Sequence, residues 1–380
     1  MAVADATSGK DEQELQLASQ WRLMWWAFRR HKLAVVGGTI VLLFYFIALF
    51  CEFLSPFDPE STGARDVYHP PQMLRLIYEK EDGGWGFGPH VRAMTQKRDP
   101  FTLETTFEPD PGNLIFISFL AKGTPYKLWG IIPLERRLFT ASKVGEKFFL
   151  LGADRLGRDM LSRILYGARV SMTIGLVGVA ISLTLGITLG GVSGYFGGRV
   201  DAIIQRLVEL ILALPTIPIW LGLSASLPQD WSPLTRYFAI TAILSLVGWT
   251  ELARVVRGRF LALRTEDFVV AARLDGASRA RVIGRHMAPA MASHIIASVT
   301  LAIPLMIIAE TSLSFLGLGL QPPLISWGVL LREAQNVQSI AQAPWLFIPG
   351  IAVVVAVLSL NFLGDGMRDA ADPYAQGQSA

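Results

Sequence analysis

The chain has 380 residues, of which 52% are hydrophobic and 17% are charged, and its mean hydropathy is +0.41. This balance excludes an ordinary soluble protein of that length. The net charge of +3 points to no particular partner, and the single cysteine, Cys51, excludes an intramolecular disulfide and a cysteine-based metal site.

Residues 1–32 begin polar and acidic and then become aromatic and basic. We expect a short interfacial helix that leads into an uncleaved first span, because tryptophans prefer the headgroup level of a membrane. The residues that carry this prediction are Trp21, Arg22, Trp25, Trp26, Phe28, Arg29, Arg30 and Lys32. The simpler alternative is that this segment is only a charged flank of the first span, which implies the same topology.

Six apolar runs follow that are long enough to cross a membrane. About 20 apolar residues in a helix match a hydrocarbon core of about 30 Å. The runs cover residues 33–54, 170–193, 203–227, 237–253, 292–316 and 345–363. Prolines in the third and sixth runs are tolerated in a bundle, where neighbouring helices satisfy the freed backbone groups. The predicted fold class is therefore an all-α membrane protein with a six-helix transmembrane bundle.

The distribution of charge predicts the orientation of these spans. Segment 15–32 carries four basic residues and no acid, and segment 253–290 carries eight arginines against three acids. Six spans place both segments on one side, and the positive-inside rule makes that side cytoplasmic, together with both termini. The predicted divisions are an N-terminal segment 1–32, a first helix 33–54, a periplasmic loop 55–168, a permease domain 169–363 and a cytoplasmic tail 364–380.

The loop 55–168 is nearly neutral, with 15 basic and 14 acidic residues, and it is rich in proline and glycine. Short β-like runs at 114–119 and 126–132 predict a small periplasmic insertion of turns and short strands. This subdomain either contacts an external binding protein or serves as a lid or packing insert.

Four charged residues stand just before the second span and are candidates for a periplasmic interface: Arg155, Arg158, Asp159 and Arg163. We expect the last three to form ion pairs along a helix at the outer face. A snorkelling interfacial helix is the alternative interpretation.

Small residues recur within the spans. Gly186, Gly190, Gly194 and Gly198 are spaced four residues apart, which is typical of close helix packing, either against a second subunit or within this one.

The third span is interrupted by the run Leu214-Pro215-Thr216-Ile217-Pro218. Broken helices often line permeation paths, so Pro215, Thr216 and Pro218 are candidates for the pore.

Ionisable residues within spans are costly and usually face the bundle interior. Glu310 lies next to several hydroxyl side chains and is a candidate either for structural hydrogen bonding or for the pore and its gate. Glu209 is placed for an i,i+3 pair with Arg206, and we expect a structural role for His294.

The cytoplasmic loop 253–290 has its own local pattern. Phe268 to Leu274 has helical composition, Gly276 can take a positive φ that ends this helix, and Ser278 is a good N-cap for a second one. That second helix ends or bends by Pro289. We therefore predict a helix, a glycine turn and a helix parallel to the membrane surface. Arg273, Arg279, Arg281 and Arg285 offer charge to a partner.

This segment resembles the EAA motif of ABC importer permeases: two alanines, three residues, a glycine, and a proline about a dozen positions later. Here these are Ala271, Ala272, Gly276 and Pro289, while Val270 and Ala288 depart from the motif's glutamate and leucine. The resemblance implies that the loop couples to an ATPase subunit. The coupling candidates are Ala271, Ala272, Arg273, Gly276, Ala277, Ser278 and Pro289. A basic helix–turn–helix for DNA is the competing interpretation, and the flanking spans argue against nucleic acid.

Three further segments resemble the C-type subunit of the dipeptide, oligopeptide and nickel branch of these permeases. They read FRRHKLAVVG at 28–37, LGADRLGRDMLSRILYGARVSMTIGL at 151–176 and ETSLSFLGLG at 310–319, with Ala153 where the branch usually has threonine. The resemblance implies a type I ABC importer-like bundle in the inner membrane. It also implies a second permease subunit as heterodimer partner, two ATPase subunits that bind ATP and Mg, an external substrate-binding protein, and surrounding lipid.

The chain itself carries no P-loop, no HExxH or CxxC metal motif and no GxSxG nucleophile elbow. We therefore expect no enzyme, no cofactor and no metal on this chain. Peptides are the first expectation for cargo, with oligosaccharides, opines and nickel as alternatives. A stand-alone secondary transporter needs coupling acids at the midplane and usually an internal repeat, and a membrane-anchored scaffold does not need the basic loop.

Overall fold

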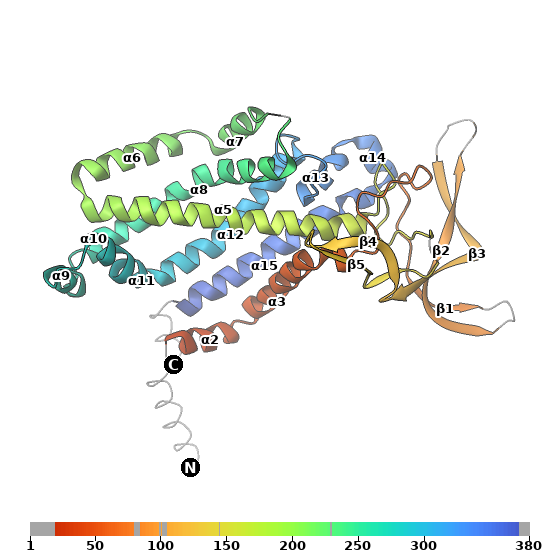
Figure 1. The fold of residues 1–380 in the computed structure, drawn as a ribbon, viewed down its shortest axis with the longest axis horizontal. Coiled ribbons are helices and arrows are strands. Elements are labelled where there is room, and N and C mark those ends of the chain that lie inside the picture. Colours follow the sequence, from red (N-terminus) through yellow and green to blue (C-terminus); the bar gives the residue numbers. More distant parts are fainter. Residues whose placement is uncertain are drawn as a thin grey trace, which may run out of the picture.

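The computed structural model describes residues 20–79, 84–98, 100, 105–143, 145–228 and 230–371. The predicted polar start of the chain and the end of its tail lie outside these residues. Long helices run side by side along the molecule, and a group of strands lies at one end of them (Figure 1).

The long helices carry the apolar spans. They are α3 (Lys32–Leu49), α5 (Met160–Phe196), α8 (Pro233–Leu263), α12 (Ala292–Phe315) and α15 (Ile348–Ala371), preceded at the N-terminal side by α2 (Gln20–Arg30) and extended after α3 by α4 (Cys51–Leu54). Among the described residues, five helices are long and apolar enough to cross a membrane. A sixth is added if α6 (Gly198–Ala213) and α7 (Thr216–Ala225) are one broken span.

Two predicted spans are shorter than the helices that contain them. Run 170–193 lies within the 37-residue α5, and run 237–253 lies within the 31-residue α8. Hydropathy detects only the apolar middle of each helix. Both helices continue through polar, arginine-containing turns because the backbone hydrogen-bond ladder does not require apolar side chains.

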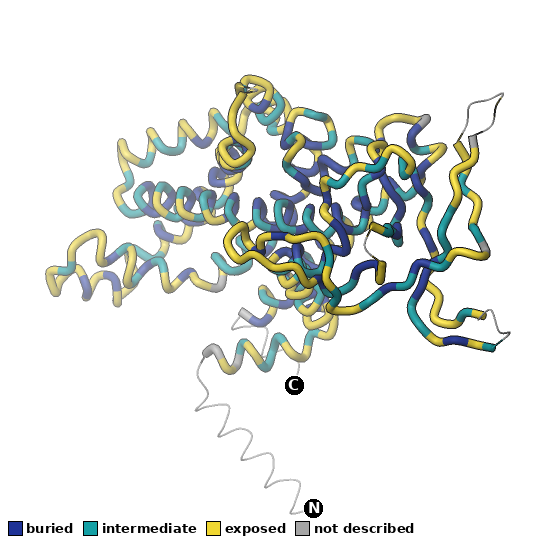
Figure 2. Tube along the Cα trace, turned by 45° about the vertical axis from the view of Figure 1, so that its right-hand side comes forward, coloured by how far each residue is buried: buried dark blue, intermediate teal, exposed yellow. Residues whose placement is uncertain are grey.

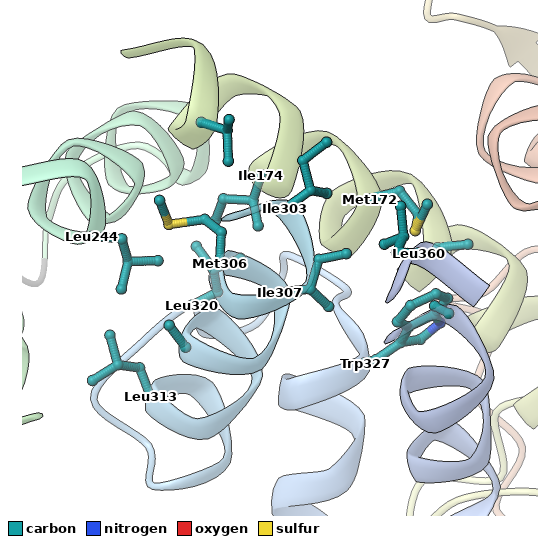
Figure 3. Packing of buried hydrophobic residues seen from close by; sticks show 14 of the residues in the cluster. Met172, Ile174, Leu244, Ile303, Met306, Ile307, Leu313, Leu320, Trp327 and Leu360 are labelled. Carbon is teal, nitrogen blue, oxygen red and sulfur yellow. The ribbon is translucent and has the colours of Figure 1, made fainter. Parts of the chain in front are cut away.

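The helical core lies where α5, α8, α12 and α15 meet. Met172, Leu244 and Ile307 are fully buried there and belong to one apolar cluster (Figure 3). Trp327, on the short helix α13 (Trp327–Leu331), closes this core, and its indole Nε1 donates to Ile164 O at 3.1 Å. Figure 2 shows the buried residues concentrated where the long helices pack.

The glycine repeat of α5 packs against α8 of the same chain. A Cβ built on Gly190 would stand 2.5 Å from Ala253 O, and one on Gly194 would stand 2.7 Å from Arg257 O. A Cβ on Gly186 would stand 2.8 Å from the Leu252 side chain, whereas a Cβ on Gly198 would have no described atom within 4 Å. Of the two alternatives for this repeat, the structure therefore supports packing within one subunit for its first three glycines.

We expect Gly190→Ala to reduce the amount of folded chain several-fold, because the added methyl group collides with backbone that cannot move aside and such overpacking costs about 1–3 kcal/mol. Gly222→Ala in α7 is the matched control, since no described atom lies within 4 Å of its added Cβ. Fluorescence-detected size exclusion of detergent extracts measures both variants. Equal yields would contradict this account of the α5–α8 contact.

The β part contains an antiparallel sheet in the order β1-β2-β3-β6 and a separate hairpin β4-β5. The strands are β1 (Arg75–Glu79), β2 (Trp85–Arg98), β3 (Thr105–Phe119), β4 (Lys122–Leu128), β5 (Ile132–Arg136) and β6 (Phe139–Ala141). The predicted run 114–119 lies at the end of β3, and run 126–132 forms the turn of the β4–β5 hairpin. Val91, Ile115 and Phe148 are buried in a small core of their own.

Arg137 connects this β part to the helices through hydrogen bonds. It is 1% exposed, and its guanidinium donates to Ser55 O at 2.8 Å, Glu52 O at 3.2 Å and Thr124 Oγ1 at 3.0 Å. Its donors therefore satisfy the carbonyls at the end of α4 and the β4 strand together. Burial lowers the pKa of Arg137, and the hydrogen bonds replace only part of the lost hydration of the charge.

A partly buried ion pair lies next to this attachment. Arg169 on α5 binds Glu52 on α4 through two nitrogens, each 2.5 Å from a carboxylate oxygen. Glu52 also accepts from the backbone N of Trp129 in the β4–β5 turn at 3.2 Å. One carboxylate thus joins three segments that are far apart in the sequence.

Candidate functional site

The loop between α8 and α12 has the predicted local structure. Helix α9 (Asp267–Leu274) ends at a turn in which Gly276 has φ +81°, and Ser278 Oγ accepts from the backbone N of Arg281 as an N-cap. The helix, the glycine turn and the cap are confirmed. This loop lies at the end of the molecule opposite the strands (Figure 1).

The second part of the loop departs from a regular helix. A single turn, α10 (Arg279–Arg281), passes into the π-helix η1 (Val282–Met287) and then into α11 (Ala288–Ala290), which contains Pro289. Proline lacks a backbone N–H, and its ring clashes with the carbonyl four residues earlier, so the chain widens before it. The prediction that the second helix ends or bends by Pro289 is met by its end, since η1 stops at Met287.

One face of α9 is buried against the loop's own core. Val269 is fully buried and Ala272 is 8% exposed, in a cluster with Phe260, Val282 and Met287. Ala272 therefore allows α9 to approach η1 and the end of α8 closely. Ala272 was predicted to couple to an ATPase subunit. Because its side chain does not reach the surface, it contributes to such a contact only by letting α9 pack closely.

The other face of α9 is exposed and apolar. Leu274 is 82% exposed, and Phe268 and Val270 are 44% and 40% exposed. Two of the arginines that flank this face lie over aromatic rings at the end of α5: Arg273 over Tyr195 at 6.0 Å and Arg279 over Phe196 at 5.3 Å. These cation–π contacts tie the loop to α5 and still leave the guanidinium groups exposed.

The predicted break in the third span is present. Helices α6 and α7 meet at Leu214–Pro215 with a bend of 87°. Pro215 and Pro218 are exposed and Thr216 is partly exposed in this single chain. The broken span thus presents an open face away from the helical core.

Helix α6 contributes to two pairs of charged residues. The predicted pair Arg206–Glu209 is confirmed at 3.0 Å and is exposed. A second pair was not predicted: Asp201 binds Arg257 on α8 through both carboxylate oxygens, at 2.5 and 2.6 Å. Asp201 and Arg257 are 56 positions apart in the sequence, so no local pattern signals this contact.

Glu310 lies in the helical core and is fully buried. Its carboxyl oxygens accept from Ser314 and Ser326 at 2.7 Å each and from Ser171 at 3.4 Å. These hydroxyls come from α5, α12 and the start of α13, so Glu310 joins three helices. In this conformation it is shielded from the face that carries the α6–α7 break.

The four charged residues before α5 are arranged differently from the prediction. Arg158 pairs with Asp154 at 2.7 Å, and Arg163 pairs with the same carboxylate at 3.4 Å. The predicted ion pairs to Asp159 are wrong, because Asp159 is the N-cap of α5 and accepts from Ser162 N and Oγ. Asp154 was missed, although it belongs to the same LGADRLGRD run.

Burial limits the interface role of this group. Asp159 and Arg163 are each 3% exposed, and Arg163 donates inward to Pro59 O at 3.1 Å. Only Arg155 of the four predicted residues is exposed, and its backbone N donates to Glu333. Burial raises the pKa of Glu333, with Asp154 nearby adding to the shift.

Burial raises the pKa of Asp159 to about 6, although the bonds from Ser162 oppose the shift. Because this folded-state pKa is above the ordinary value of 3.8, the stability contributed by the protonated carboxyl is lost as pH rises from about 4 through 6. An asparagine at this position does not titrate, so we expect the free energy of unfolding of Asp159→Asn to fall by about 3 kcal/mol less than that of the wild type over this range. Asparagine also caps helices, so the cap is kept. Melting temperatures of both forms at pH 4.5 and 7.5 test this, and parallel pH profiles would contradict it.

Comparisons with known proteins place these features in context. Residues 186–375 match the family described as binding-protein-dependent transport system inner membrane component. Residues 19–71 match the N-terminal TM domain of oligopeptide transport permease C.

Several similar proteins are named permeases. The dipeptide transport system permease protein DppC of Bacillus subtilis (strain 168) is 37% identical over 224 residues, which are 58% of this chain and 68% of that protein. The glutathione transport system permease protein GsiD of Pectobacterium atrosepticum is 30% identical over 361 residues, or 95% and 93% of the two chains. The second match extends across the β part.

A solved structure of the MetNI methionine ABC transporter in inward-facing conformations is also similar. Its TM-score is 0.43 and its identity 17%, over 56% of this chain and 98% of that chain.

Proposed function

The chain belongs to the family of binding-protein-dependent transport system inner membrane components, and we propose that its cargo is peptides or similar oligomeric solutes. Members of this family are the pore-forming, multi-pass subunits of ABC importers and are not themselves catalytic. The observation that carries the cargo is the match of residues 19–71 to the oligopeptide permease C domain, supported by relatives named for dipeptides and glutathione. Oligosaccharides, opines and nickel remain the alternative cargoes, ahead of a stand-alone secondary transporter.

The proposed complex contains a second, related permease as heterodimer partner, two ATPase subunits that bind ATP and Mg, and an external substrate-binding protein. The exposed face of α6 and α7 is the proposed surface for the second permease, and the exposed face of the α9 loop is the proposed surface for an ATPase subunit. ATP hydrolysis then belongs to the partner subunits, in keeping with the missing P-loop in this sequence.

The proposed topology has six spans, with α6 and α7 counted as one, and both termini in the cytoplasm. The basic α9 loop and the arginines of α2 face the cytoplasm, and the β part forms the periplasmic insertion. The separation of the α9 loop and the strands to opposite ends of the helices supports this arrangement (Figure 1).

In the proposed mechanism, closure of the ATPase subunits moves the exposed face of α9, which carries Val270 and Leu274. Helix α9 is packed through Ala272 onto α8 and η1, so its displacement is transmitted to the long helices. The break at Pro215, Thr216 and Pro218 is the proposed pore lining, and we assign Glu310 to the supporting core.

Purification of the tagged chain in mild detergent tests the assembly. We expect a second permease and P-loop subunits to co-purify with ATPase activity, and uptake of labelled peptide into proteoliposomes to require the binding protein and ATP. Recovery of the chain alone, folded and without ATPase activity, would refute the importer assembly. Uptake of an oligosaccharide or nickel, without peptide uptake, would refute the proposed cargo.

Topology has a separate test that uses the single cysteine. In a Cys51→Ala chain, we expect a cysteine placed at Leu274 to be labelled only from the cytoplasmic side and one at Trp85 only from the outside. Both positions are more than 70% exposed, so labelling reports sidedness and not burial. Labelling of both from one side would contradict the proposed topology.

A further inference from the structure

The chain has an apolar groove at one end of its first span. It measures about 540 Å³, within the range of about 300–1,000 Å³ that ligand sites occupy. Trp25 and Phe28 of α2, Gly38 and Leu42 of α3, and Leu363 and Met367 of α15 line it. None of these residues belongs to the coupling loop or to the α6–α7 break.

Gly38 makes the floor of the groove. A Cβ at this position would stand 3.4 Å from Leu363 Cδ1 and 3.7 Å from Phe28 Cζ, so any larger side chain would extend into the space between α2 and α15. The walls stay open because Trp25 and Phe28 stack on each other, with ring centroids 5.9 Å apart, and Leu42 is 72% exposed.

The length of the groove matches one leaflet of a bilayer. Its lining on α3 runs from Val35 to Tyr45, ten residues and hence about 15 Å along the helix. That is half of a hydrocarbon core of about 30 Å. The apolar part of the groove therefore spans the depth that a single acyl chain occupies.

Basic residues lie on and next to the helices that line the groove, although none is in its lining and the Arg22 guanidinium lies over the Trp26 ring at 4.9 Å. On α2, Arg22 and Arg29 lie three residues before and four residues after Trp25, so the three share one helix face. The charged residues of this region are five basic ones against two acids: Arg22, Arg29, Arg30, Lys32 and Arg368 against Asp365 and Asp369. Asp369 already lies 4.0 Å from His31 Nε2.

We propose that this groove binds one anionic phospholipid, with an acyl chain along Gly38 and Leu42 and the phosphate headgroup at Arg22 and Arg29. The apolar walls exclude a polar solute, and the excess of positive charge next to the groove favours a negative headgroup over a zwitterionic one. Bound lipid fills the space between α2, α3 and α15 and holds α2 at the membrane surface. The inference rests on α3 being a membrane span and does not depend on the cargo.

Native mass spectrometry of the intact complex, exchanged into nanodiscs of phosphatidylglycerol and phosphatidylcholine, tests this site. We expect one phosphatidylglycerol molecule to be retained after the nanodisc lipid is removed. Gly38→Phe places a ring in the groove and abolishes retention. Leu43→Phe places the same ring on α3 outside the groove, where Leu43 is 55% exposed, and keeps it.

A second variant leaves the apolar lining of the groove unchanged. We expect Arg22→Gln/Arg29→Gln to lower the preference for phosphatidylglycerol over phosphatidylcholine about thirtyfold, since each basic residue near an anionic surface contributes about 1 kcal/mol. Retention that is equal in wild type and Gly38→Phe would overturn the site. Cross-linking of a cysteine at Leu42 to the second permease, with no lipid retained, would also overturn it and assign the groove to the subunit interface.

Discussion

Replacement of Gly276 by proline is expected to abolish uptake while the complex still assembles. The turn after α9 needs φ +81°, which proline cannot adopt, and the N–H of Gly276 donates to Arg273 O at 3.1 Å. Proline removes both the conformation and the donor, so α9 loses its fixed orientation toward α10. We expect uptake at least about tenfold lower, with uncoupled ATPase activity, because the strain of one to several kcal/mol falls on the contact surface itself.

Gly276→Asn is the matched control. Asparagine adopts positive φ more readily than other residues, and no described atom lies within 4 Å of a Cβ at Gly276, so the turn is kept and uptake stays near the wild-type level. Size exclusion shows whether the ATPase subunits remain bound in both variants. Normal uptake by Gly276→Pro would remove the turn from the mechanism. Equal loss in both variants would show that the backbone angle is not the cause.

The second large effect is expected at the ion pair between Glu52 and Arg169. Arg169→Met leaves a carboxylate that is 5% exposed without its partner, and breaking such a pair from one side costs up to about 3 kcal/mol, since the arginine itself is partly exposed. We expect a lower melting temperature of the complex and faster proteolysis of the β4–β5 hairpin, because Glu52 also holds the backbone N of Trp129.

The double variant Glu52→Gln/Arg169→Met separates the pair from its surroundings. It removes both charges, so part of the lost stability is expected to return, and a double-mutant cycle gives the coupling energy. Arg206→Met is the control for losing an arginine, since its pair with Glu209 is largely exposed and is worth about 0.5 kcal/mol or less. Equal melting temperatures for Arg169→Met and Arg206→Met would contradict the structural role of this pair.

Sequence patterns were most informative where one segment determines its own conformation. The turn at Gly276, the cap at Ser278, the end of the helix before Pro289 and the break at Pro215 were all predicted because φ preference, capping and the missing proline N–H are local properties. The apolar runs were located for the same reason, although the ends of α5 and α8 were not, since helices continue beyond the residues that make them apolar.

Contacts between distant segments could not be read in this way. Asp201 pairs with Arg257 on another helix, Ala272 faces inward instead of toward a partner, and Glu310 lies in the core. Each of these depends on which side chain a neighbouring segment leaves unsatisfied. Spacing along one helix does not contain that information.

By itself, the sequence determined that this protein crosses a membrane, that it resembles an importer permease, and that its basic loop carries a helix–glycine–helix turn. Only the tertiary structure decided which charges are buried, how the β part is fastened through Glu52 and Arg137, and where α2, α3 and α15 leave an apolar groove. The physical reason is the separation along the sequence over which each effect acts. Hydropathy and backbone preference act over a few residues, whereas burial and ion pairing are set by packing between segments that can be more than a hundred residues apart.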